Sequence, residues 1–230
     1  MFYKLQSLVY RSEILTEENI LKELCFFINA LPDWVEKKSK WFIANHNEKM
    51  VAIDNCMATQ KGYDHVRSEI VKDDIFNIVL ADEKEDDSAL TISFRNTPVV
   101  SNQRYLLSLT IKSLERGSDL DVFVEFVKRV IKLKAWGFKY IIVDTEQYKR
   151  KQRCAFHDRL SVGWMLYLPT KIERMDVPSA HSVVNIEGGL GSIVVSKQFF
   201  DGKEPSDIIV ANNVEIELAS KGLLPLIKGL

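Results

Sequence analysis

The sequence has few cysteines and no marked excess of charge of either sign. Its three cysteines, Cys25, Cys56 and Cys154, are scattered over 230 residues, which argues against a disulfide framework and favours a reducing compartment. The formal net charge of −1 excludes a strongly basic nucleic-acid surface as a property of the whole chain. No apolar run reaches the roughly 18–20 residues that a membrane span needs.

The amino terminus also lacks the pattern of a secretory signal. Residues 1–7 alternate polar and apolar side chains, as a strand does, and no long apolar segment or small-residue cleavage site follows. We therefore expect a cytoplasmic protein that binds neither membrane nor nucleic acid. The composition, 46% hydrophobic and 27% charged, is that of an ordinary globular chain.

Strand patterns recur along the whole chain. In residues 104–114, Leu107, Leu109 and Ile111 fall on one face, and Ser108 and Thr110 fall on the other. Residues 33–70 show no clear pattern and are expected to be mixed. Further strands are expected over residues 2–10, 75–80, 89–94, 140–143, 163–168, 182–186 and 191–196.

Three amphipathic helices are expected between these strands. Thr16 is the expected N-cap of the first, Ser118 of the second and Ser206 of the third. The grouping of strands and helices predicts an α+β fold, mostly antiparallel, with long helices packed on one face. No linker divides the chain, so we expect one domain, 1–230, in which 1–138 and 139–230 are two similar strand-and-helix halves.

The strongest catalytic lead is the pair Asp144 and Glu146, which directly follows the apolar strand. Alternation places both carboxylates on one face at the end of this strand, where metal-dependent nucleases hold divalent ions. Such nucleases also use a lysine two residues after the acid, whereas Lys149 lies three residues after Glu146. A metal-dependent hydrolase is therefore the alternative reading, and a polar strand exit is favoured.

The other chemical constellations are incomplete. Cys154, His157 and Asp158 supply a thiol, a base and a carboxylate, but on one short turn the last two face apart. Histidines 46, 65, 157 and 181 are far apart in sequence, without metal-ligand spacing. The glycines of residues 187–191 indicate a hairpin, and the basic run 149–153 a solvated connection. We expect no cofactor, no metal site and no enzymatic activity.

One segment is strongly acidic. Five carboxylates fall within six residues, at Asp82, Glu83, Glu85, Asp86 and Asp87. Such a run is commonly a solvated hairpin connection. It is also a candidate docking surface for a basic partner, because complementary charge speeds association.

The carboxyl-terminal third carries a family resemblance. Residues 162–169 read Val-Gly-Trp-Met-Leu-Tyr-Leu-Pro, 177–180 read Val-Pro-Ser-Ala, and 211–216 read Ala-Asn-Asn-Val-Glu-Ile. With the Lys-Gly-Leu-Leu-Pro ending at 221–225, they resemble the immunity protein 52 family over residues 155–228. These are cytoplasmic bacterial proteins paired with restriction-endonuclease-like toxins, some delivered by type VI secretion.

The resemblance implies a role without naming contact residues. Trp164, Leu166 and Leu168 lie on one face of the motif strand, with Met165 and Tyr167 on the other, as in a strand covered on both sides. These residues are therefore expected to define the core. The implied function is that of an immunity protein, which binds a cognate nuclease toxin and occludes its active site or groove. An adaptor protein with a different partner is the third reading.

Overall fold

Not every residue has a described position. The computed structural model describes residues 2–11, 15–32, 39–44, 50–72, 76–82, 90–96, 104–112, 120–133, 136–145, 147–148, 151 and 153–230. By the contacts between Cα atoms these fall into two compact units, each of which is described by itself. The C-unit comprises Met1–Ser7, Ser113–Val124 and Phe138–Leu230, and the N-unit comprises Leu8–Lys112 and Glu125–Gly137.

The N-unit combines a sheet with amphipathic helices. Its strands follow the order β7-β6-β5-β2-β3-β4, and each neighbouring pair in this order is antiparallel. The elements are α1 (Glu17–Ala30), β2 (Lys40–Ile43), β3 (Val51–Asp54), β4 (Met57–Ala58), α2 (Gln60–Lys72), β5 (Asn77–Ala81), β6 (Leu90–Asn96) and β7 (Arg104–Lys112).

The C-unit contains the other strands and the longest helix. The order is β10-β11-β9-β8-β1, and β10-β11, β11-β9 and β9-β8 pair antiparallel. Three elements, β1, α3 and β8, contribute residues to both units. The elements are β1 (Phe2–Tyr10), α3 (Leu120–Ile131), β8 (Gly137–Thr145), β9 (Met165–Leu168), η1 (Arg174–Asp176), β10 (Ser182–Ile186), η2 (Glu187–Gly189), β11 (Gly191–Val195), α5 (Pro205–Ser220) and η3 (Ile227–Gly229).

The α+β class and the predominance of antiparallel pairing are thus confirmed. The first helix starts as its sequence predicts, because the Thr16 hydroxyl accepts a hydrogen bond from the Asn19 amide at 3.2 Å. The prediction for the last helix is wrong in one detail. Glu204 is the N-cap of α5 and Pro205 occupies its first position, so Ser206 lies inside the first turn. Ser118 lies outside the described residues.

Residues 33–70 contain a helix that the sequence did not reveal. In α2, Val66 is fully buried and Gly62 lies against the strand β3. A Cβ atom at Gly62 would come within 2.4 Å of the Ala52 carbonyl oxygen. The helix therefore approaches the sheet through a glycine, and its sequence lacks the broad apolar face by which helices are recognised. Trp41, on β2, belongs to the core with 1% of its surface exposed, and Trp34 lies outside the described residues.

Each unit buries a largely apolar core. In the C-unit, side chains from β8, β9, β11 and α5 pack together, among them Ile142, Leu166, Val194, Val214 and Leu218. In the N-unit, Phe27 of α1 contacts Trp136 with ring centroids 5.9 Å apart. All four residues of β9 are buried, which confirms a strand covered on both sides. Among the described residues, no helix is long and apolar enough to cross a membrane.

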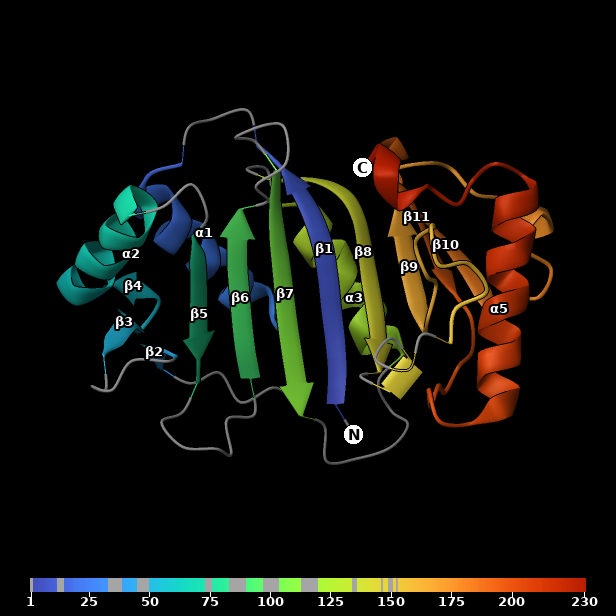
Figure 1. The fold of residues 1–230 in the computed structure, drawn as a ribbon, viewed down its shortest axis with the longest axis horizontal. Helices are drawn as coiled ribbons and strands as arrows, with labels where there is room; N and C mark the ends of the chain where they lie inside the picture. Colours follow the sequence, from blue (N-terminus) through green and yellow to red (C-terminus); the bar gives the residue numbers. More distant parts are fainter. Residues whose placement is uncertain are drawn as a thin grey trace. The chain divides into compact units, whose positions relative to one another are not determined.

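Figure 1 shows how α1 relates to the sheet of the N-unit. The helix lies behind β5, β6 and β7 in this view, and none of the described helices of the N-unit lies in front of these three strands. The alternation of burial along β6 agrees, because Leu90, Ile92 and Phe94 are buried, whereas Ser93 is only partly covered and Arg95 is exposed. One face of these strands therefore packs against the core and the other is open.

Candidate functional site

The acidic segment begins with a carboxylate that is buried. Asp82 follows β5 with 3% of its surface exposed, and its side chain accepts a hydrogen bond from the Leu90 amide at 3.1 Å. The Asp82 amide in turn donates to the Leu90 carbonyl at 3.2 Å. Asp82 thus stabilises the start of the β5–β6 connection. Glu83, Glu85, Asp86 and Asp87 lie outside the described residues, so the docking role of this segment stays a prediction.

Asp144, the first carboxylate of the alternative metal-dependent hydrolase, is also buried. It lies at the end of β8 with 2% of its surface exposed, and its Oδ1 accepts a hydrogen bond from the Thr145 amide at 2.6 Å. Gly163 packs directly over the carboxyl group, since a Cβ there would come within 2.6 Å of the Asp144 Cγ. Glu146 and Lys149 lie outside the described residues. Within the described part of the chain, no three His, Cys, Asp or Glu side chains are grouped closely enough to hold a metal ion.

The Cys154 constellation lies in a segment of bends rather than on a helical turn. Cys154 is half-buried, whereas His157 and Asp158 are exposed. The two flanking arginines are directed to main-chain oxygens: Arg153 donates to the Gly202 carbonyl at 3.4 Å, and Arg159 donates to the Leu224 carbonyl at 2.6 Å. These contacts give both arginines a structural role in joining this segment to the carboxyl-terminal residues.

A buried carboxylate within the family-like motif organises the C-unit. Glu215 of α5 is fully buried, and its Oε1 accepts hydrogen bonds from the Val162 amide at 2.8 Å and the Tyr148 hydroxyl at 2.9 Å. Its Oε2 accepts from the Ala155 amide at 2.7 Å. Glu215 therefore fixes the irregular segment between β8 and β9 to α5. This contact joins the motif pieces at 162–169 and 211–216 in space.

Burial governs the protonation of this group. Removal from water raises the pKa of Glu215 above its ordinary value, and its hydrogen bonds only partly oppose that rise. Burial also raises the pKa of Tyr148, and the neighbouring Glu215 carboxylate raises it further, so the phenol stays protonated and able to donate. Because Glu215, Tyr148, Ala155 and Val162 satisfy one another, we interpret this cluster as structural.

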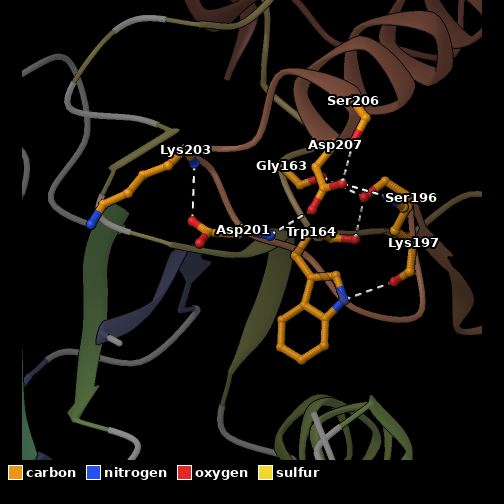
Figure 2. A network of polar contacts seen from close by, with 8 residues as sticks. All are labelled: Gly163, Trp164, Ser196, Lys197, Asp201, Lys203, Ser206 and Asp207. Carbon is orange, nitrogen blue, oxygen red and sulfur yellow. Dashed lines mark hydrogen bonds and ion pairs between the residues drawn. The ribbon is translucent and has the colours of Figure 1, made fainter. Parts of the chain in front are cut away.

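Figure 2 shows a second polar network, at the start of α5. Asp207 accepts hydrogen bonds from the Asp201 amide at 2.8 Å and the Ser206 hydroxyl at 3.1 Å, and it pairs with the Lys197 ammonium. Burial alone would raise the pKa of Asp207, but these hydrogen bonds together lower it. The Lys197 carbonyl accepts from the Trp164 indole at 2.9 Å. The network thus connects the motif strand, through Lys197, to the helix N-terminus, where a negative charge is favourable.

The open face of β5, β6 and β7 is different, because its polar groups are partly exposed. Neighbouring strands place short side chains side by side in rows: Val79 beside Ser93 and Ser108, and Thr91 beside Thr110. The hydroxyl residues of these rows are partly covered and none is fully buried. The result is a flat surface of hydroxyl groups, supported underneath by the N-unit core.

Two arginines lie on the same open face. Arg95 of β6 is exposed and is paired in register with Leu106 of β7. Arg104 of β7 donates through Nε to the Tyr10 hydroxyl at 2.7 Å, and its guanidinium carbon lies 5.3 Å from the centre of the Tyr10 ring. Among the described residues of β5, β6 and β7, none that faces this side is acidic. Both charged side chains that the structure describes on this face of β5, β6 and β7 are therefore cationic, in a chain whose formal net charge is −1.

Sequence patterns reveal part of this arrangement. The alternation in β7 correctly separates Leu107 and Leu109 from Ser108 and Thr110. It does not show that the polar face stays uncovered by the described helices of the N-unit, nor that Tyr10 holds Arg104. The sequence shows Glu215 only as part of the 211–216 motif. Its structural role follows from its full burial and from the three groups that donate hydrogen bonds to it.

Comparisons with known proteins support a fold and no more. No protein-family model matches the sequence, and no curated protein matches it. The fold is similar to that of the T6SS protein PA0821 of Pseudomonas aeruginosa, with a TM-score of 0.55 and 14% sequence identity. The match covers 94% of this chain and 76% of that one. It thus extends well beyond residues 155–228, whereas membership of the immunity protein 52 family stays a prediction.

Proposed function

We propose that this chain is an immunity protein of the immunity protein 52 type, acting in the cytoplasm. It would bind a cognate toxin, a nuclease delivered by type VI or related secretion, and neutralise it by occluding the active site or substrate groove. The observation that carries the proposal is the fold shared with a T6SS protein over 94% of the chain. The resemblance of residues 162–169 and 211–225 to the immunity protein 52 family supports the proposal independently, because it lies in the sequence alone.

The burial of the motif residues is consistent with this role. Trp164, Leu166 and Leu168 form core, and Glu215 fixes the preceding segment. Residues of this kind preserve a fold, while the partner contacts lie on other surfaces and differ with the partner. Neutralisation then requires only stoichiometric binding, over an interface that typically buries about 1,200–2,000 Å² in total.

The proposal is tested by co-expression with the protein encoded by the neighbouring gene. We expect that protein to stop growth when it is expressed alone, and we expect this chain to restore growth and to co-purify with it in a fixed ratio. A matched control co-expresses a Glu215→Ala variant, which is expected to lose the fold of the C-unit and to protect poorly. Growth arrest that the wild-type chain neither relieves nor reduces would refute the immunity role.

Calorimetry tests the alternative of a metal-dependent hydrolase. Purified protein is titrated with Mg²⁺ and separately with Mn²⁺, together with an Asp144→Ala variant. Because Asp144 is buried beneath Gly163 and accepts a main-chain hydrogen bond, we expect no saturable heat of binding. Saturable binding that disappears in the variant would favour the hydrolase over the immunity protein.

A further inference from the structure

The open face of the N-unit sheet has the properties of a docking platform. Its central strand, β6, is hydrogen-bonded on one side to β5 and on the other to β7. A partner therefore cannot add a strand here and has to meet the side chains. The opposite face of β6 packs into the core through Ile92 and Phe94, so the platform is held rigidly.

The side chains on this face lose little freedom on binding. Thr91, Ser93, Ser108 and Thr110 are short, and the Ser93 hydroxyl already donates to the Asn77 side chain at 2.9 Å. Short side chains have little rotamer entropy to lose, in contrast to lysine or glutamate. Hydroxyl groups also both donate and accept, so they can satisfy polar groups of either kind on a partner.

The charge of the face identifies the chemistry of the partner. Arg95 is exposed, and Arg104 is held by the Tyr10 hydroxyl and ring. Arginine is favoured at protein interfaces because its planar guanidinium binds carboxylates through paired hydrogen bonds. The described residues of β5, β6 and β7 that share this face include no carboxylate beside Arg95.

On these observations we propose that the open face of β5, β6 and β7 binds a carboxylate-bearing surface of the partner protein, with Arg95 as its exposed cationic contact. The inference rests on the proposed function for the partner's identity, a toxin whose surface presents clustered Asp or Glu side chains. The hydroxyl rows supply the flat surroundings of the contact.

The test measures association between the purified chain and the toxin encoded beside it, using the wild type and Arg95→Glu. We expect Arg95→Glu to weaken the affinity by at least about tenfold and Arg95→Gln to weaken it less, because the first introduces repulsion and the second only removes attraction. The matched control is Lys22→Glu, which makes the same charge change at an exposed position of α1, on the helical side of the sheet. This control should bind within twofold of the wild type.

The outcomes separate this inference from the function on which it depends. Wild-type protein that binds and protects, together with Arg95→Glu that binds equally well, would overturn the docking face and leave the immunity role intact. Loss of binding in Ile209→Lys or Ile216→Lys, exposed positions on α5, with Arg95→Glu unaffected, would move the interface to the C-unit. Wild-type protein that neither binds nor protects would overturn both proposals. Circular dichroism confirms that each variant is folded.

Discussion

Replacing Glu215 by glutamine tests whether the buried carboxylate holds the C-unit together. The carboxylate accepts from the Ala155 amide with one oxygen, and from the Val162 amide and the Tyr148 hydroxyl with the other. Glutamine keeps only one oxygen, so its NH₂ group must face a donor. A buried donor without an acceptor costs about 1–3 kcal/mol. We therefore expect Glu215→Gln to lower the free energy of unfolding by roughly 2 kcal/mol.

The assay is urea unfolding followed by circular dichroism and tryptophan fluorescence, with linear extrapolation to water. Glu187→Gln, which makes the same change at an exposed position in η2, is the control and should alter the unfolding free energy by less than about 0.5 kcal/mol. If Glu215→Gln were as stable as this control, Glu215 would not be the anchor that its contacts indicate.

The difference in stability between the wild type and Glu215→Gln should depend on pH. Burial raises the pKa of Glu215 in the folded protein, so the folded state binds this proton more tightly than the unfolded chain. The contribution of Glu215 to stability is therefore fully present below its ordinary pKa and decreases as pH rises through the raised value. The stability difference between the wild type and Glu215→Gln should therefore shrink as the pH rises above the ordinary pKa of 4.5. A difference that grows over this range would mean that the hydrogen bonds outweigh desolvation.

Two further predictions concern backbone strain and thiol exposure. Gly163 has a φ of +55°, and a Cβ there would collide with Asp144, so Gly163→Ala should destabilise the protein by more than about 2 kcal/mol. Gly188→Ala, at a φ of +76° but in open space, should cost only roughly 1 kcal/mol, and equal costs in urea unfolding would contradict the predicted collision. Burial raises the pKa of Cys25 to about 11, whereas Cys56 is exposed, so Cys56→Ser should remove the fastest phase of reaction with a thiol reagent. Fast labelling of Cys25 in the native protein would show that α1 opens.

Apolar spacing, capping residues and glycines correctly predicted the elements that depend on residues close together in the sequence. The apolar spacing of α1, together with Thr16, fixed its start, and the glycines after Ile186 predicted the turn between β10 and β11. The apolar periodicity does not predict α2, because this helix contacts β3 through Gly62 and not through a large apolar side chain. At the start of α5 the sequence predicts Ser206 as the N-cap, whereas the helix begins with Glu204 as N-cap and Pro205 at its first position. In α2 the missing information was a neighbour on β3, whereas at α5 it was a choice between adjacent residues.

The candidate sites followed the same rule. Asp82 reads as one of five equivalent carboxylates, yet the Leu90 amide, eight residues later, gives it a buried structural role. Asp144, one carboxylate of the alternative metal site, is buried with Gly163 packed over it. Spacing along the chain identifies groups capable of chemistry. Only their burial and partners distinguish a functional group from a structural one.

The acidic connection and the arginine face predict partners of opposite charge, and this difference can be measured. If the connection docks a basic toxin, changing Glu83, Glu85, Asp86 and Asp87 to their amides should slow association and weaken its salt dependence. Asp82 is left unchanged, because its buried carboxylate binds the Leu90 amide. If Arg95 instead meets carboxylates, the same four substitutions remove repulsion, and association should stay as fast or become faster. Stopped-flow association rates at low and high salt distinguish these results, and a slower quadruple variant combined with an unaffected Arg95→Glu would place the interface at the connection.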